Sequence, residues 1–177
     1  RTYTLPDATG TVALTSDITT HGVARVGGTA TETTTTSTTD GDLVTIASLS
    51  IAAASPILVV VGYTKSSGAA AGVELGLKLN TTVLGSDARG VTDSTNEEAS
   101  GVCVFIIAPR LSGASLGYSG GIQIFAADGA AGESADHYSI NGRPSGTITD
   151  VVIRGRSTNA SVTLGIMGVH VYTLATS

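Results

Sequence analysis

The chain has 177 residues, which suggests one domain with additional segments, long enough to bury a core without disulfides or metals. Charged residues make up 13% of the sequence and the mean hydropathy is +0.30, a low charge content for a soluble monomer. The formal net charge is −5 and Lys and Arg form no cluster, which argues against nucleic acid as a partner. The longest apolar run is too short to cross a bilayer, so we expect no membrane insertion.

The residue types favour an all-β chain without cofactors. Thr, Val and Ile recur along the sequence, and their stiff β-branched side chains suit strands better than helices. The single cysteine, Cys103, cannot form an internal disulfide and lies in the apolar run VCVFII, which predicts a buried thiol. The three histidines are dispersed and the acidic residues lack EF-hand spacing, so we expect no metal and no cofactor.

The first predicted element is a β-hairpin over residues 1–18, within the run YTLPDATGTVALTSDI. Tyr3 and Leu5 share one face of its first strand, and Val12 and Leu14 share one face of its second. The intervening PDATG supplies the turn. Because an isolated hairpin is marginal in water, we expect these four apolar side chains to be buried against a partner surface.

Two further segments follow the hairpin. Residues 19–42 are low-complexity and rich in Thr and Gly, which predicts a linker or an extended arm. Over residues 43–177, strand-like runs alternate with turn-rich segments, which predicts a jelly-roll-like β-sandwich head of about eight antiparallel strands. The predicted strands cover residues 43–51, 56–64, 73–80, 101–111, 121–127, 137–140, 147–157 and 161–174.

Some of these runs are apolar on both faces. In an antiparallel sandwich the outer face normally meets water and is polar, as it would be for the alternating run LVTIASLSI. PILVVVGY and VCVFIIA instead leave no polar face, so something must cover their outer side. The cover is either another part of the chain or a neighbouring subunit, and we expect homo-oligomerisation.

The loop over residues 128–146 is the predicted ligand-binding segment. It is long, polar and turn-rich, and long loops on a rigid sandwich commonly carry recognition. Its chemistry suits sugars or polar surfaces, because it combines aromatic, amide and charged groups: Asp136, His137, Tyr138, Asn141 and Arg143. The alternative is structural, with Tyr138 packed beneath the loop and Arg143 paired with Asp136.

The sequence offers two kinds of catalytic residues, a G-x-S-x-G serine and acidic residues, and neither has the context that its chemistry needs. GYSGG at 117–121 matches G-x-S-x-G, but that motif requires a strand before the serine and a helix after it. Here a Gly/Ser-rich loop precedes the serine and a strand-like run follows it. Glycoside hydrolysis requires two suitably spaced carboxyl groups, whereas the acids lie mainly in turns and Trp is absent. We therefore expect no enzymatic activity, with polysaccharide depolymerase as a minor alternative.

The opening segment also carries a resemblance. The run from Tyr3 to Ile18 resembles a short element that recurs in bacteriophage tail-fibre and other virion appendage proteins, often just before a distal β-rich domain. LPD, GTVAL and SD within it match that element. The resemblance implies a homotrimeric structural protein on the virion exterior, joined to other virion proteins through its N-terminal region. Three hairpins wound about a common axis would then form a trimer interface from Tyr3, Leu5, Val12 and Leu14.

Two functions remain open from the sequence. The first is a tail-fibre-like head that attaches to a host-surface glycan or protein. The second is a capsid decoration or head-fibre protein. A host-binding head should expose a polar, Tyr-bearing loop surface at the end distal to residue 1. A decoration protein should instead have its N-terminal arm extended and docked on other capsid proteins.

Overall fold

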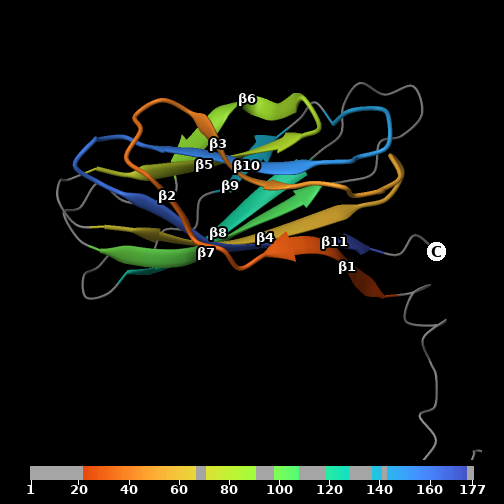
Figure 1. Ribbon diagram of the computed structural model, residues 1–177, viewed down its shortest axis with the longest axis horizontal. Helices are drawn as coiled ribbons and strands as arrows, with labels where there is room; N and C mark the ends of the chain where they lie inside the picture. Colours follow the sequence, from red (N-terminus) through yellow and green to blue (C-terminus); the bar gives the residue numbers. More distant parts are fainter. Residues whose placement is uncertain are drawn as a thin grey trace, which may run out of the picture.

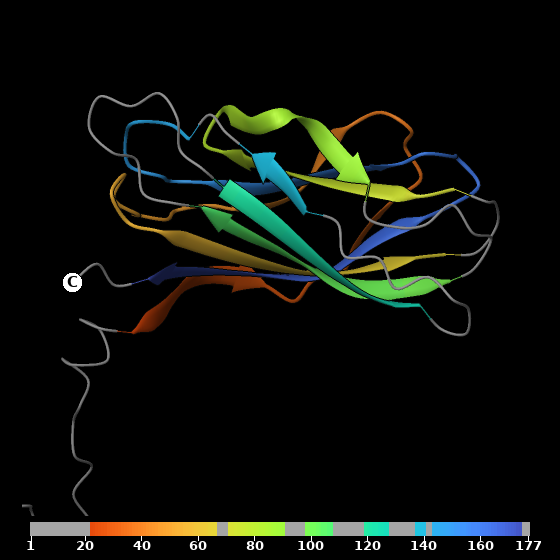
Figure 2. The same ribbon diagram turned by 180° about the vertical axis from the view of Figure 1, so that it is seen from behind.

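The computed structural model describes residues 22–66, 71–90, 98–107, 119–127, 137–140 and 143–174. Every regular element in these ranges is a strand, and the eleven strands form two antiparallel sheets packed face to face. Figures 1 and 2 show the two layers from opposite sides. The predicted all-β sandwich is therefore confirmed. No helix in the described residues could cross a membrane.

Seven strands form the larger sheet, called sheet A, and four form sheet B. Sheet A has the order β1-β11-β4-β7-β8-β9, and β2 also pairs with β11. Its strands are β1 (Val23–Thr29), β2 (Thr33–Thr35), β4 (Ile57–Lys65), β7 (Ala99–Ile107), β8 (Ser119–Ala127), β9 (His137–Ile140) and β11 (Leu164–Leu174). Sheet B has the order β3-β10-β5-β6, with β3 (Gly41–Ile46), β10 (Val151–Ser157), β5 (Val73–Leu79) and β6 (Thr82–Gly90).

The strand order is that of a jelly roll. If β1, β3, β4, β5, β6, β7, β10 and β11 are counted from one to eight, sheet A contains 1-8-3-6 and sheet B is 2-7-4-5. This is the order in which two interlocked Greek keys arrange eight strands in two sheets. The pair β8 and β9 is inserted between the sixth and seventh strands and extends sheet A beyond β7.

The core lies between the two sheets and follows the period of two along each strand. In β4, burial alternates through the strand, and Ile57, Val59, Val61 and Tyr63 are each at most 1% exposed. Cys103 is a free buried thiol on β7, as its apolar setting predicted. Other fully buried side chains come from both sheets: Leu75, Leu77, Phe105, Ile153, Leu164, Ile166, Val169 and Val171.

The segment expected to be a linker or arm, residues 19–42, contributes two strands to the sandwich. β1 pairs with β11 from Val23 opposite Leu174 to Thr29 opposite Val169, and β2 pairs with the other end of β11. β1 is the first strand of the jelly roll, so the domain includes Val23 rather than starting at residue 43. The Thr/Gly-rich composition did not predict these strands, because their strand conformation depends on pairing with β11, which lies far away in the chain.

The first alternating run is also shorter than its pattern suggested. LVTIASLSI was expected to form one strand over 43–51, but β3 ends at Ile46. Ser48 has φ of 60°, in the left-handed region that non-glycine residues rarely adopt. This break changes which side chains face inward, so that Val44 and Ile46 before it and Leu49 after it are all buried.

One strand was missed because its residues are typical of a turn. β6 has the sequence TVLGSDARG and pairs with β5 through a two-residue loop, in which Asn80 has φ of 54°. The Asn80 side chain anchors this turn to the segment just before β10. Its Oδ1 accepts from the backbone N–H of Thr149 at 2.8 Å, and its Nδ2 donates to the Thr147 carbonyl at 3.0 Å.

An ion-pair cluster on sheet B makes stability depend on pH. Asp42 accepts from Lys78 and from Arg154, the latter at 3.1 Å, so these partners hold the pKa of its carboxyl below its ordinary value. The stabilisation is present above the ordinary Asp pKa and is lost as the pH falls through the lowered value. Because the Asp42 side chain is 44% exposed, we expect Asp42→Asn to lower the free energy of unfolding by only about 0.5–1 kcal/mol at pH 7.

Urea unfolding at pH 7 and pH 2.5 measures this contribution. The difference between the wild type and Asp42→Asn should shrink toward zero at the lower pH. Glu32→Gln, which neutralises an exposed carboxylate between β1 and β2, is the control and should change stability little at either pH. An Asp42→Asn penalty that persists undiminished at pH 2.5 would contradict the electrostatic origin.

Candidate functional site

The outer faces of the two sheets differ in chemistry. Sheet B carries charged side chains that pair across its strands, as is usual for a face in water. Arg156 Nε donates to Glu74 Oε2 at 2.7 Å, and Asp42 binds Lys78 and Arg154 as described. Sheet B therefore has the polar outer face that an antiparallel sandwich is expected to have.

Sheet A has an apolar outer face instead. Alternation along β4 and β7 places five aliphatic side chains outward, and we call these residues the apolar face: Leu58, Val60, Val102, Val104 and Ile106. Leu58 lies opposite Ile106 and Val60 lies opposite Val104 across the two strands. Val102 is 39% exposed and Ile106 is 41% exposed, whereas Leu58, Val60 and Val104 are half-buried within the described chain.

The same outer face becomes polar farther along β4. A row of cross-strand partners runs over four strands of sheet A: Thr34 on β2, Gly165 on β11, Thr64 on β4 and Ser100 on β7. Thr64 lies six residues beyond Leu58, or roughly 20 Å along the strand. The outer face of sheet A therefore has an apolar part and a polar part at opposite ends of β4.

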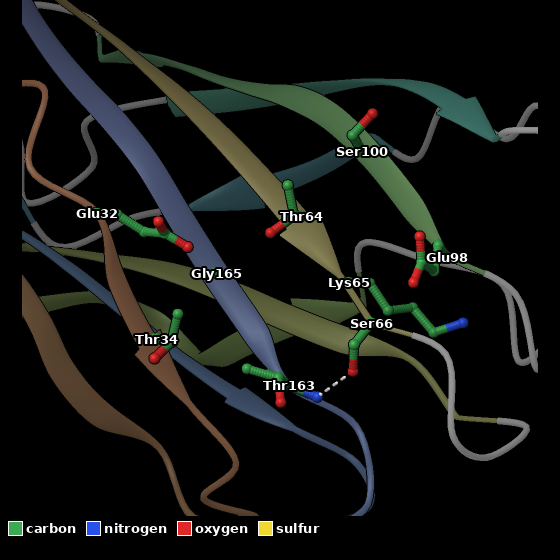
Figure 3. A pocket seen from close by; sticks show the side chains of 9 residues that line it. All are labelled: Glu32, Thr34, Thr64, Lys65, Ser66, Glu98, Ser100, Thr163 and Gly165. Atoms are coloured by element: carbon green, nitrogen blue, oxygen red, sulfur yellow. Dashed lines mark hydrogen bonds between the residues drawn. The ribbon is translucent and has the colours of Figure 1, made fainter.

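A cavity of about 520 Å³ lies over this polar row. Figure 3 shows the nine side chains and backbone positions that line it: Glu32, Thr34, Thr64, Lys65, Ser66, Glu98, Ser100, Thr163 and Gly165. Glu32 precedes β2 and Glu98 precedes β7, so the two exposed carboxylates approach from opposite sides of β11 and β4. Lys65 lies at the cavity but is only 2% exposed.

Hydrogen bonds hold the wall of the cavity in place. The backbone N–H of Thr163 donates to Ser66 Oγ at 2.9 Å, and the backbone N–H of Ser66 donates to the Thr163 carbonyl at 3.0 Å. Thr64 Oγ1 lies 4.0 Å from the sulfur of Met167, which is a weak acceptor. The cavity therefore has a fixed polar wall while the Thr64 hydroxyl keeps most of its capacity to bind a ligand.

The cavity lies at the end of the sandwich away from where β1 begins. Val23 pairs with Leu174, and the Leu174 N–H donates to the Pro56 carbonyl at the start of β4. Lys65 and Ser66 are at the other end of β4, nine residues later. The cavity is therefore at the end of the sandwich opposite Val23, and none of the described residues of the loop over 128–146 lines it.

The predicted ligand loop is only partly within the described residues. Asp136 and Asn141 lie outside them. His137 and Tyr138 begin β9, where their backbones pair with Ile122 and Gly121 of β8. The structure therefore places these two residues on the edge strand of sheet A.

Arg143, the fifth residue of that predicted set, has a structural position. Its side chain is 5% exposed, and its Nη2 donates to the carbonyls of Ser55 at 2.7 Å and Ala52 at 3.2 Å. Burial lowers the pKa of the guanidinium from its ordinary value. Arg143 therefore fastens the segment after residue 142 to the connection between β3 and β4.

The other sequence predictions concern sites that the structure describes less fully. The predicted trimer-interface residues Tyr3, Leu5, Val12 and Leu14 lie outside the described residues. The serine of GYSGG, Ser119, opens strand β8, so a strand follows it where a nucleophile elbow needs a helix. Among described residues, no group of three or more His, Cys, Asp or Glu could hold a metal ion.

Comparisons with known proteins show no family. No protein-family model matches the sequence, and no curated protein matches it either. A protein of unknown function from Shewanella oneidensis MR-1 aligns over 87% of this chain and 70% of its own, with 11% identity and a TM-score of 0.36. The CBM2 module of the evolved Dit of Lactobacillus casei BL23 phage J-1 aligns over 70% of this chain and 64% of its own, with 12% identity and a TM-score of 0.29. Neither TM-score reaches 0.5, so these likenesses carry no functional argument.

Proposed function

We propose that this chain is a non-enzymatic structural protein of a bacteriophage virion. In this proposal its jelly-roll domain is a trimeric head on the virion exterior that attaches to the host surface. The observation that carries the proposal is the apolar face of sheet A, which a soluble monomer would leave in water. The resemblance of residues 3–18 to a virion appendage element supplies the phage context and the threefold symmetry.

The apolar face supports assembly through its contrast with sheet B. The two sheets pack on the same core and meet the same solvent, yet among the described residues only sheet B places charged pairs on its outer side. Contiguous apolar surface on a folded domain marks a contact with another molecule, and interfaces between copies are richer in apolar area than ordinary surface. A second and a third copy of the chain are the partners that this proposal assigns to the face.

The chain path supports a common axis for the hairpin and the apolar face. Residues 1–21 join the domain at β1, which is at the edge of sheet A opposite β9. A hairpin that bundles three chains would therefore hold three copies of sheet A near one another. In this arrangement the N-terminal region faces other virion proteins, and the end of β4 at Lys65 faces the host.

The mass in solution and the position on the particle test the proposal. We expect a native mass of three times the 17.6 kDa of one chain, and antibody label at the tip of a tail appendage on intact virions. A stable monomer at micromolar concentration would contradict the trimer. Label spread over the capsid would favour the decoration protein instead, and cleavage of a polysaccharide by the purified trimer would contradict the non-enzymatic role.

A further inference from the structure

The cavity over the polar row has the chemistry of a binding site for a neutral, polyhydroxylated ligand. Its volume of about 520 Å³ is within the range of small-molecule sites, roughly 300–1,000 Å³. Most such sites are lined by apolar and aromatic side chains, whereas eight of the nine residues that line this one carry a hydroxyl or a charged group, and the ninth is Gly165. An apolar ligand would leave those groups unsatisfied, so the cavity favours a ligand with many hydroxyls.

The lining supplies both donors and acceptors. Thr34, Thr64 and Ser100 carry hydroxyls that can donate and accept, and they lie in one row across neighbouring strands. The carboxylates of Glu32 and Glu98 flank this row and accept hydrogen bonds only. Vicinal hydroxyls of a sugar can donate to a carboxylate and accept from a threonine, which is the complement of this arrangement.

Gly165 keeps the floor of the cavity open. A Cβ at Gly165 would lie 2.5 Å from Thr64 Oγ1 and 3.8 Å from Glu32 Oε1. A side chain here would therefore displace the Thr64 hydroxyl and occupy the space between the two. The glycine thus leaves room for a ligand atom above β11, between Thr64 and the side of the cavity where Glu32 lies (Figure 3).

The charges at the cavity select against anions. Two carboxylates, on Glu32 and Glu98, are exposed at its sides, whereas Lys65, the one lysine among the described lining residues, is 2% exposed. A phosphate or an acidic sugar would meet more negative than positive charge. A neutral saccharide carries no charge that the carboxylates would repel, and its hydroxyls can donate to them.

From these observations we infer that the cavity at the distal end of sheet A binds a neutral saccharide. The inference rests on the proposed host attachment and names the class of surface molecule that the head would take. Among the residues that the structure describes, no aromatic side chain lines the cavity to stack on a sugar ring. A single site therefore binds weakly, and a trimer gains avidity when its three sites engage one surface.

The test is titration of the purified full chain with defined saccharides, followed by heteronuclear NMR and calorimetry. The probes are lactose, maltose, cellobiose and N,N′-diacetylchitobiose, with 3′-sialyllactose as the anionic comparison. We expect saturable binding of at least one neutral disaccharide, with shift changes at Thr64, Ser100 and Gly165, and weaker binding of the sialylated probe than of lactose.

Variants separate the cavity from the rest of the surface. Thr64→Val removes one hydroxyl at nearly constant shape and should weaken binding about three- to tenfold, and Glu98→Gln should weaken it about tenfold. Thr45→Val is the matched control, because Thr45 is exposed on β3 of sheet B. Its affinity should equal that of the wild type.

Three results would overturn the inference: no binding of any neutral probe, equal losses in Thr64→Val and Thr45→Val, or tighter binding of 3′-sialyllactose than of lactose. The native mass of the same sample is recorded in parallel. A trimer that binds no saccharide would overturn this inference and leave the assembly intact, whereas a monomer that binds saccharide would overturn the trimer and leave the cavity assignment standing.

Discussion

Replacing Val102 and Ile106 by lysine should convert the proposed trimer to a folded monomer. The two side chains lie on β7 and are 39% and 41% exposed. Burying this exposed surface in an interface therefore contributes on the order of 1 kcal/mol per residue. Two lysines would instead place unpaired ammonium groups in an apolar contact, which costs several kcal/mol. We expect the dissociation constant to rise by more than about hundredfold, measured by analytical ultracentrifugation over a concentration series.

The fold should survive this change, since both positions face outward and the buried partners on β7, Cys103 and Phe105, are unchanged. The matched control is Thr45→Lys, which introduces the same side chain into an exposed strand position of sheet B. It should remain trimeric with an unchanged melting temperature. If the double-lysine variant stayed trimeric, the apolar face could not be the contact between copies. If it became a dimer, the threefold assignment would fail.

Gly28→Ala should destabilise the domain by about 3 kcal/mol, because β1 is part of the sandwich. Gly28 has φ of 153°, a conformation that residues with a Cβ rarely adopt. An added Cβ would also lie 2.5 Å from the Val169 carbonyl oxygen on the neighbouring strand β11. Backbone atoms paired in a sheet cannot move aside as a flexible side chain can, so both terms oppose folding.

Thermal unfolding measures the effect, and the melting temperature should fall by about 6–12 °C for a chain of this size. Gly41→Ala is the control within the same Thr/Gly-rich segment, since a Cβ there meets nothing within 4 Å. It should be neutral or slightly stabilising, because alanine restricts the unfolded chain more than glycine does. Equal melting temperatures for the two variants would mean that residues 19–42 behave as the linker that their composition predicted.

Several features of the molecule could be predicted because they depend on neighbours along the chain. The runs of residues 56–64 and 101–111 contain aliphatic residues at both odd and even positions, so both faces of β4 and β7 had to be apolar in any sheet. The buried thiol of Cys103 followed from the same local pattern. In each case the alternation of side chains along a single strand was enough for the prediction, because it does not depend on which strand pairs with it.

The cavity could not be predicted, because its residues come from separate parts of the chain. Thr34 lies opposite Gly165, and Thr64 lies opposite both Gly165 and Ser100. Each is an ordinary polar residue near a strand end, with no motif around it. The loop over 128–146 looked more distinctive, yet the one described side chain of its predicted set, that of Arg143, binds backbone carbonyls in the interior.

The sequence by itself determined that this chain is all-β, that it contains a sandwich, and that two strands have an apolar outer side, since alternation and β-branching act within single strands. Only the tertiary structure decided that residues 23–29 and 33–35 are strands, which strands pair within the predicted jelly roll, and that the apolar face and the polar cavity lie at opposite ends of one sheet. The physical reason is that pairing in this fold joins residues more than a hundred positions apart, and register between distant strands leaves no periodic signal in either one.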